Sequence, residues 1–276
     1  IKDELFKVPT NKVASLVGDL VDVEAVFSLK LLLNKLGIEN LDCRIDGAEI
    51  GKDGRSGYIF NSGISGIENA DALLIVGSNP RIEASVLNAR IRKRYLKGNF
   101  PIGLIGSKSN LTYPYQYLGS SSLDIEKLKD KNNSFHKIFA KAENPMIIVG
   151  MGALIDDCGS VVLNSLRELS EFFGVVQKGW NGFNVLQTAA GRTGALDIGF
   201  TPSKKGLNAK TIFSEGEKGN LSFVWLLGVD SKDVLKLKKP FVVYQGHHGD
   251  VGAHIADVIL PGAAFTEKSA TYVNTE

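Results

Sequence analysis

Cysteine is scarce in this chain of 276 residues, which contains only Cys43 and Cys158, far apart in the sequence. Small domains that depend on disulfides have many more cysteines, so a disulfide framework is excluded and a reducing compartment is favoured. An iron–sulfur cluster usually takes four thiolates, which two cysteines cannot supply. We therefore expect no disulfide framework and no iron–sulfur cluster within these residues.

Long apolar runs and an excess of charge of one sign are also lacking. Apolar runs such as Met146–Ile155 fall short of the roughly 20 residues that a membrane span needs. The formal net charge is +2, so no overall field draws the chain to nucleic acid or to an anionic membrane. With 43% hydrophobic and 22% charged residues, the composition is that of a globular protein. We expect no nucleic-acid partner and no direct insertion into a membrane.

The two ends of the chain suggest a piece of a longer polypeptide. The first residue is Ile1 and not methionine, and the last is Glu276. Thr271–Val273, close to that end, has the pattern of a β-strand. Because domains seldom end within such an element, we expect further chain beyond these residues.

One pattern recurs along the chain: a short aliphatic strand, a glycine, a polar loop and often a helix. Continuous apolar runs without alternation indicate strands that are buried on both faces, as in parallel sheets. Strands that alternate with helices predict an α/β doubly wound fold with mainly parallel sheets. The glycines that follow or end the predicted strands are Gly18, Gly77, Gly106, Gly150, Gly228 and Gly246.

Three helices are predicted after these strands. Asp22 can cap a helix that ends at Gly37. Asn79 and Pro80 provide the cap and first turn of a helix to about Leu96. A third helix follows Gly152 and stops at Gly174. The apolar residues expected on one face are Val23, Val26, Phe27 and Leu31 in the first helix, and Val162, Leu166, Leu169 and Phe173 in the third.

The strand and helix pattern divides into two halves. The polar stretch Ser120–Lys137 resembles a surface connection that leads to a second unit beginning near Pro145. We predict two Rossmann-like units, residues 1–142 and residues 143–276, with the second truncated at its C-terminus.

A glycine-rich loop is the first candidate for cofactor binding. Ligands of open α/β sheets usually bind beyond the carboxyl ends of the strands, where these glycines lie. GMGALI (Gly150–Ile155) has the first two glycines of a dinucleotide fingerprint, but Ile155 occupies the third position and no acidic residue follows at the usual distance. Tight packing at a strand-to-helix turn explains these glycines better than a nucleotide does.

Nucleophilic catalysis finds no support in the sequence. Neither NSGISG (Asn61–Gly66) nor GSKSN (Gly106–Asn110) has the G-x-S-x-G pattern of a nucleophile elbow. Cys43 and Cys158 have no histidine nearby in the sequence, so each is interpreted as a buried or incidental cysteine.

The strongest basic cluster is RIRKRYLK (Arg90–Lys97). On a helix, Arg90, Lys93, Arg94 and Lys97 form one cationic stripe. A solvated helix face explains such a stripe most simply, and a surface for a partner protein is the alternative. Nucleic acid is disfavoured because no stacking aromatic residues or nucleic-acid motif accompany the cluster.

Three of the four histidines lie within one short stretch, Tyr244–Gly262. His247, His248, Asp250 and His254 could in principle bind a divalent metal. Adjacent residues on an extended loop point in different directions, however, and the helical H-E-x-x-H pairing is absent. We interpret these residues as hydrogen-bonding groups that shape a loop, and we assign no catalytic, cofactor-binding or metal-ligating residue to the chain.

Four segments carry a resemblance to a known family: Tyr244–Glu276, Ala70–Lys93, Ile105–Gly119 and Ala195–Pro202. They resemble the large iron–sulfur subunits (75 kDa-type) of respiratory NADH:quinone oxidoreductase, complex I. The later portion of those subunits is in turn similar to molybdopterin oxidoreductases such as formate dehydrogenase. ADVILP with FTEKSATYVNTE resembles the signature of that superfamily, although Ser269-Ala270 stands where the signature usually has glycine. Lys12–Gly37 resembles its first nucleotide-type βα unit.

The resemblance implies a role for the chain within a larger assembly. In this family the iron–sulfur clusters lie in an N-terminal cysteine-rich region, which would precede Ile1, and they pass electrons from NADH toward quinone. The present residues would be the molybdopterin-oxidoreductase-like domain, a non-catalytic scaffold without pterin or molybdenum. Its partners would be other subunits of the complex I peripheral arm. The subunit would lie on the cytoplasmic side of the bacterial inner membrane or on the matrix side of the mitochondrial one. A fragment of an active, formate dehydrogenase-like molybdopterin enzyme is the alternative.

Overall fold

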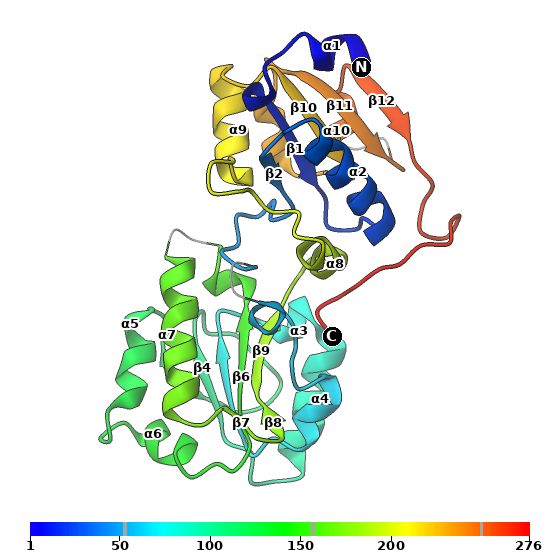
Figure 1. Cartoon of the computed structure of the whole chain (residues 1–276). Helices are drawn as coiled ribbons and strands as arrows, with labels where there is room; N and C mark the ends of the chain where they lie inside the picture. The colour runs from blue at the N-terminus through cyan, green and yellow to red at the C-terminus, as the bar shows by residue number, and fades with distance from the viewer. Residues whose placement is uncertain (52–53, 156–157, 249–250) are drawn as a thin grey trace. The chain divides into compact units, whose positions relative to one another are not determined.

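The computed structural model describes residues 1–51, 54–155, 158–248 and 251–276, and it forms two compact units (Figure 1). Unit 1 consists of Ile1–Gly47 and Ala189–Asn274, and unit 2 of Ala48–Thr188 with Thr275 and Glu276. Each unit contains a parallel sheet with helices on both faces. The predicted α/β doubly wound fold with mainly parallel sheets is therefore confirmed.

The division into units differs from the predicted boundary between residues 142 and 143. Strand β6 (Pro145–Gly150) follows that boundary, yet it pairs in parallel with β3 (Ala72–Val76), which precedes it. Strand β1 (Val13–Val17) pairs with β10 (Phe223–Leu227), although Ser15 and Trp225 are 210 positions apart. A boundary at 142 would cut both sheets. The polar stretch that suggested a connection forms part of unit 2, because a linear pattern does not reveal a chain that leaves one unit and returns to it.

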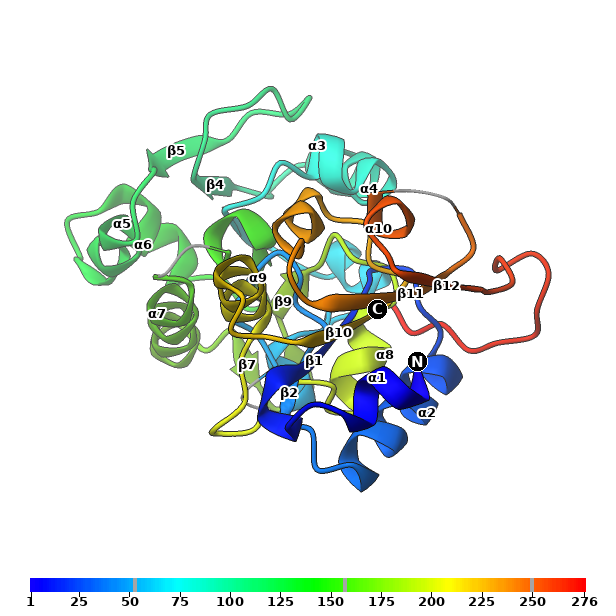
Figure 2. The ribbon, with the colours of Figure 1, turned by 90° about the horizontal axis from the view of Figure 1, so that it is seen from above.

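The sheet of unit 1 has the strand order β12-β11-β10-β1-β2, and all neighbouring pairs are parallel. Every residue of β1 is buried, as expected for its mainly apolar sequence, and its one polar residue, Ser15, donates a hydrogen bond to the Trp225 carbonyl. Figure 2 shows α1, α2 and α8 on one side of this sheet and α9 and α10 on the other. The further strands are β2 (Asn40–Asp42), β11 (Phe241–Gly246) and β12 (Val258–Pro261), and the helices are α1 (Lys2–Phe6), α2 (Val23–Lys35), α8 (Arg192–Asp197), α9 (Ala209–Lys218) and α10 (Val251–His254).

Helix α2 begins where the sequence predicts it. The side chain of Asp22 accepts a hydrogen bond of 2.9 Å from the backbone N–H of Ala25, which caps the first turn. The predicted core face was partly wrong, because Phe27 and Leu31 are exposed. The residues of α2 that are buried are instead Val26, Leu29 and Leu33.

The sheet of unit 2 has the order β5-β4-β3-β6-β9, again with parallel neighbours. Helices α3 and α4 cover one face, where Leu87 and Ile91 join the apolar core, and α5, α6 and α7 lie on the other (Figure 1). The strands are β4 (Ile102–Ile105), β5 (Gln116–Gly119), β9 (Phe183–Leu186) and a hairpin of β7 (Val176–Gln177) and β8 (Trp180–Asn181). The helices are α3 (Pro80–Glu83), α4 (Ser85–Leu96), α5 (Leu123–Glu126), α6 (Ser134–Phe139) and α7 (Gly159–Phe172).

Two predicted elements differ from the structure. The single helix expected from Pro80 to Leu96 is broken at Ala84, whose φ of −152° and ψ of 70° are not helical. The strand expected at Thr271–Val273 is absent, because these residues make isolated backbone hydrogen bonds to α2 and α8 and no ladder. By contrast, α7 buries Val162, Leu166 and Leu169 as predicted, whereas Phe173, also expected on this face, is the C-cap residue and is only partly buried. Within the described residues, no helix combines the length and apolar character that crossing a membrane requires.

Candidate functional site

Each sheet has one point where the strand order reverses, and ligands of α/β proteins bind in the crevice there. In unit 1 this switch point lies between β1 and β10, and in unit 2 it lies between β3 and β6. The loops that follow these strands are therefore the places to look for a site. The two crevices differ in how much open space their loops leave.

The crevice of unit 1 is closed by its own backbone. A Cβ atom added to Gly18 would lie 1.7 Å from the carbonyl oxygen of Gly228, so the two loops touch where only glycine fits. A hollow of about 80 Å³ remains beside them, lined in part by Asp22, His247 and Lys268. Ligand pockets typically measure about 300–1,000 Å³, so this hollow is too small for a nucleotide.

Buried charges lie beside the same strand ends. The guanidinium of Arg192, which is 1% exposed, places Nη2 2.9 Å from Asp46 Oδ2 and 3.4 Å from Asp19 Oδ1. Arg44 and Asp42 form a second buried pair with two hydrogen bonds, of 2.8 and 3.0 Å. Burial raises the pKa of Asp19 above its usual value, while Arg192 acts in the opposite direction. Each arginine is thus paired with carboxylates of the same unit, although the buried Nε of Arg192 makes no hydrogen bond within the described residues, and this pairing indicates a structural role.

A C-terminal segment, residues 264–274, is held against the start of α2. Lys268 Nζ lies 2.5 Å from Asp22 Oδ2. The backbone N–H and hydroxyl of Thr271 donate to the carboxylate of Glu24 at 3.0 and 2.7 Å. The Thr271 carbonyl in turn accepts from the N–H of Val23 at 2.9 Å. Lys268 and Thr271, which lie in the stretch that resembles the superfamily signature, thus stabilise the N-terminus of α2.

We expect Asp22→Ala to destabilise unit 1 by about 1–2 kcal/mol, because α2 loses its cap and Lys268 loses its partner. Burial by itself would raise the pKa of Asp22, but the hydrogen bonds from Lys268 and Ala25 outweigh it and hold the pKa below the usual 3.8. The contribution of this carboxylate is therefore complete above its ordinary pKa and is lost as the pH falls through the lowered value. Urea unfolding at a series of pH values measures both effects. Asp22→Asn keeps a capping oxygen, so it should lower the free energy of unfolding less than Asp22→Ala does. Equal decreases in the two variants would contradict the capping role.

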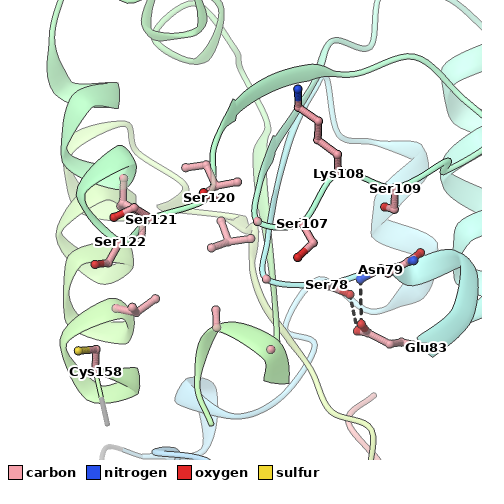
Figure 3. A pocket seen from close by; sticks show the side chains of 18 residues that line it. Ser78, Asn79, Glu83, Ser107, Lys108, Ser109, Ser120, Ser121, Ser122 and Cys158 are labelled. Atoms are coloured by element: carbon pink, nitrogen blue, oxygen red, sulfur yellow. Dashed lines mark hydrogen bonds between the residues drawn. The ribbon is translucent and has the colours of Figure 1, made fainter. Parts of the chain in front are cut away.

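The crevice of unit 2 contains a pocket of about 470 Å³ beyond the ends of β3, β4, β5 and β6 (Figure 3). Hydroxyl groups dominate its polar lining, because serines follow three of these strands. None of these serines was predicted to form a site, although each group follows a glycine that ends or succeeds a strand. The labelled residues in Figure 3 are Ser78, Asn79, Glu83, Ser107, Lys108, Ser109, Ser120, Ser121, Ser122 and Cys158.

The charged groups of this pocket are already engaged. Glu83 accepts hydrogen bonds from the Ser78 hydroxyl at 2.6 Å and from the backbone N–H of Asn79 at 2.8 Å. The ammonium group of Lys108 lies 4.5 Å from the centroid of the Tyr117 ring, and Figure 3 shows it turned away from the serines. Within the described part of the chain, Asn79 Oδ1 is buried and accepts no hydrogen bond. The groups that remain for a ligand are therefore mainly serine hydroxyls, which can donate or accept, and no cation among the described lining residues is turned toward them.

The glycines of the GMGALI loop serve close packing. A Cβ atom at Gly150 would lie 2.5 Å from the Cβ of Ser78, and one at Gly152 would lie 2.7 Å from the carbonyl oxygen of Gly77. Helix α7 does not begin until Gly159, whereas a dinucleotide fingerprint opens its helix at once. This geometry agrees with the packing interpretation of these glycines.

The two cysteines lie in different surroundings. Cys43 is buried in unit 1, and Cys158 is exposed at the pocket of unit 2. Burial raises the pKa of the Cys43 thiol to about 12, and the nearby Asp42 carboxylate adds to the rise. Since the thiolate is the reactive form, Cys43 should be inert in the folded protein.

We expect iodoacetamide to label Cys158 and not Cys43 in the folded protein at neutral pH, and both thiols in urea. Mass spectrometry of the tryptic peptides measures the two rates separately. A Cys158→Ser protein should take up no label until it unfolds. Labelling of Cys43 at the rate of Cys158 would show that unit 1 opens easily.

The histidine stretch does not converge on a metal site in the described residues. His247 and His248 are exposed, and their Nδ1 atoms contact each other within the loop. His254 is exposed on α10, and Asp250 lies outside the described residues. Across the described ranges, no group of three or more His, Cys, Asp or Glu side chains is placed to hold a metal ion.

The fold defines an α/β protein of two doubly wound units, each built on a parallel sheet. The family model described as molybdopterin oxidoreductase matches residues 4–276. The chain belongs to this family.

Curated relatives of about 40% identity span nearly the whole chain. The NADH-ubiquinone oxidoreductase 78 kDa subunit, mitochondrial, of Neurospora crassa is 43% identical over 274 residues, covering 96% of this chain and 35% of the relative. The NADH-ubiquinone oxidoreductase 75 kDa subunit of Reclinomonas americana is 40% identical, and the match covers 97% of this chain and 40% of the relative. An NADH-quinone oxidoreductase subunit of Rickettsia prowazekii is 42% identical, and the match covers 100% of this chain and 39% of the relative. The chain thus spans less than half the length of these relatives.

The residues of the two crevices do not fit the pterin group that the name of the family implies. A pterin cofactor carries phosphate, which binds to free backbone N–H groups at a helix N-terminus, to hydroxyl groups and to cations. In unit 2, Glu83 already occupies the N–H of Asn79 and adds a negative charge. In unit 1 the crevice is closed by Gly18 and Gly228. In the described residues, the crevice of unit 1 leaves too little space for the group, and the pocket of unit 2 offers its phosphate serine hydroxyls but no cation turned toward them.

Proposed function

We propose that this chain is the molybdopterin-oxidoreductase-like domain of the large iron–sulfur subunit of a respiratory NADH:quinone oxidoreductase, complex I. The observation that carries this proposal is the identity of 40–43% with three subunits of such enzymes over nearly the whole chain. The domain acts as a scaffold and contact surface and performs no chemistry. We assign it no catalytic, cofactor-binding or metal-ligating residue.

Electron transfer, from NADH toward quinone, belongs in this proposal to another part of the subunit. The iron–sulfur clusters are carried by an N-terminal cysteine-rich region. The cysteines of the present chain are unsuited to that task, because the thiol of Cys43 is buried in unit 1 and Cys158 lies alone at a polar pocket of unit 2. The crevices of the domain, closed or lined with engaged charges, support a structural role.

The partners of the domain are the other subunits of the peripheral arm. The subunit is peripheral, on the cytoplasmic side of a bacterial inner membrane or on the matrix side of a mitochondrial one. The large exposed apolar side chains on both units support a role in contacts, because scattered exposed residues are normal but several on one helix are not.

Elemental analysis of the full gene product that contains these residues tests the proposal. We expect iron and no molybdenum, and co-purification with NADH:quinone oxidoreductase activity. The family match alone would also suit an active, formate dehydrogenase-like molybdopterin enzyme. Stoichiometric molybdenum would establish that alternative and overturn the proposal.

A further inference from the structure

The outer face of α3 and α4 in unit 2 exposes apolar side chains in a regular arrangement. Ile82, Val86 and Leu96 are 80%, 83% and 69% exposed. Within α4, Val86, Ala89, Lys93 and Leu96 recur at intervals of three and four residues, so they form one stripe along the helix. Exposed apolar residues at this spacing are typical of a helix that packs against another helix.

The opposite face of α4 explains why this stripe points outward. Leu87, Asn88 and Ile91 are buried, and Leu87 and Ile91 belong to the core of unit 2. Asn88 donates to the carbonyl of Leu111 at 3.0 Å and accepts from the Tyr113 hydroxyl at 2.9 Å. Helix α4 is thus fixed in rotation, and turning it to bury Val86 would expose this core.

Positive charge surrounds the stripe. The segment from Ala84 to Gly98 has five Arg and Lys residues and no Asp or Glu. Two of these five cations have partners: Arg90 pairs with Glu68 at 3.2 Å, and Arg94 donates hydrogen bonds to two backbone carbonyls. The remaining cations, Arg92, Lys93 and Lys97, are exposed.

The nearest carboxylates neutralise this face only in part. Glu83 is turned inward to Ser78 and Asn79, and Glu68 is held by Arg90. The hydrogen bond from Arg90, supported by its charge and by those of Lys97 and Lys93, lowers the pKa of Glu68. The outer face of α4 therefore combines apolar side chains with an excess of positive charge that Glu68 offsets only in part.

Three kinds of partner differ in how they would use such a face. Nucleic acid would engage the cations and leave the apolar side chains in water. A membrane would bury the apolar side chains, but Lys93 stands within the stripe, where it would have to enter the apolar layer. A protein helix can bury the apolar side chains and place a carboxylate opposite Lys93.

We infer that the α3–α4 face, defined as Ile82, Val86, Ala89, Arg92, Lys93, Leu96 and Lys97, docks an acidic amphipathic helix of another polypeptide. The partner brings apolar side chains against Val86 and Leu96 and carboxylates against the three exposed cations. Assigning this helix to another subunit of the respiratory complex rests on the proposed function. The docking mode itself rests on the face alone.

Photo-crosslinking in the full-length protein, in cells that assemble it, tests this inference. A benzophenone amino acid is placed at Val86 or at Leu96, and for comparison at Val161, which is 59% exposed on α7 of the same unit. We expect positions 86 and 96 to crosslink one peptide that is rich in Asp and Glu and carries apolar residues, and position 161 not to. Crosslinks to lipid, to a peptide without acidic residues, or at no more than the level of position 161 would overturn the inference.

A charge-reversing variant measures the contribution of the face. Val86→Asp with Lys93→Glu should lower the crosslinked yield from position 96 by about tenfold or more, since central interface residues dominate affinity. Val161→Asp with Lys137→Glu introduces the same changes on α7 and α6 and should leave the yield unchanged. A normal yield from the first variant would overturn the inference. Sedimentation with vesicles of phosphatidylcholine and phosphatidylglycerol should show no binding that depends on these residues, and such binding would overturn it in favour of a membrane surface.

The proposed function and this inference fail in different ways. If the wild-type protein does not purify with NADH:quinone oxidoreductase, the proposed function fails, and a crosslink to an acidic helix still supports the docking mode. If the charge-reversed variant enters the complex with an unchanged crosslink, the docking inference fails and the proposed function stands.

Discussion

Gly18→Ala should unfold unit 1 and leave unit 2 folded. The new Cβ atom would lie 1.7 Å from the Gly228 carbonyl oxygen and 2.4 Å from its carbon. Neither backbone can yield easily, because the N–H of Gly18 donates to Leu227 at 2.8 Å and the N–H of Gly228 donates to Gln245 at 2.7 Å. Separating the loops would pull β1 from β10 in the middle of the sheet. We expect a loss of more than about 4 kcal/mol, the range of the most damaging single substitutions.

The two tryptophans measure the two units separately. Trp225 lies in β10 of unit 1 and Trp180 in β8 of unit 2. In a Trp180→Phe background, urea unfolding followed by fluorescence reports unit 1, and a Trp225→Phe background reports unit 2. Gly262→Ala is the matched control, because its Cβ atom would meet nothing closer than 3.5 Å. An unchanged Trp225 transition in Gly18→Ala would contradict the close approach of the two loops.

Arg192→Met should destabilise unit 1 by about 1.5–3 kcal/mol, the usual contribution of hydrogen bonds to a charged group, because the guanidinium is buried whereas the Asp46 and Asp19 side chains are 24% and 50% exposed. The guanidinium is 1% exposed and lies between Asp46 and Asp19. Without it, two carboxylates face each other beside buried strand ends. The exposed residue Arg92 provides the control, and Arg92→Met should change the stability little.

The loss caused by Arg192→Met should shrink in acid. Burial raises the pKa of Asp19 above its ordinary 3.8, and Arg192 opposes the rise. Removing the arginine raises this pKa further, so the ionised carboxylate becomes more costly at neutral pH and the cost disappears as the group takes up a proton. Unfolding measured by Trp225 fluorescence at about pH 7 and about pH 4 compares the two states. A loss of the same size at both pH values would show that Arg192 acts through packing and not through charge.

The local elements of the fold could be predicted because their signals are local. The strands of each core are uninterrupted apolar runs that end near glycine, and the structure contains a strand at each of the six predicted places. The cap at Asp22 was recognisable for the same reason, since its partner Ala25 is three residues away. The break at Ala84 was not, because alanine is the residue most favourable to helix and nothing nearby signals an interruption.

The division into units and the polar pocket could not be predicted because they depend on distant residues. The pairing of β1 with β10 brings together residues about 210 positions apart, and no local pattern records it. The pocket collects serines from three loops, and the short, mixed strand β5 that positions Ser120 and Ser121 has no clear apolar pattern. The general location, beyond the carboxyl ends of the strands, was foreseen, but the residues were not.

The discontinuity of unit 1 has a consequence for biosynthesis. Strands β1 and β2 leave the ribosome before unit 2, whereas β10, the other neighbour of β1, follows β1 by more than 200 residues, after every strand of unit 2. At about 5–20 residues per second, the apolar edge of β1 waits roughly 10–40 s for its partner. Unit 2, contiguous except for its last two residues, can complete its sheet during that interval. Nascent chains stalled before β10 should therefore be the form of this protein that most needs a chaperone.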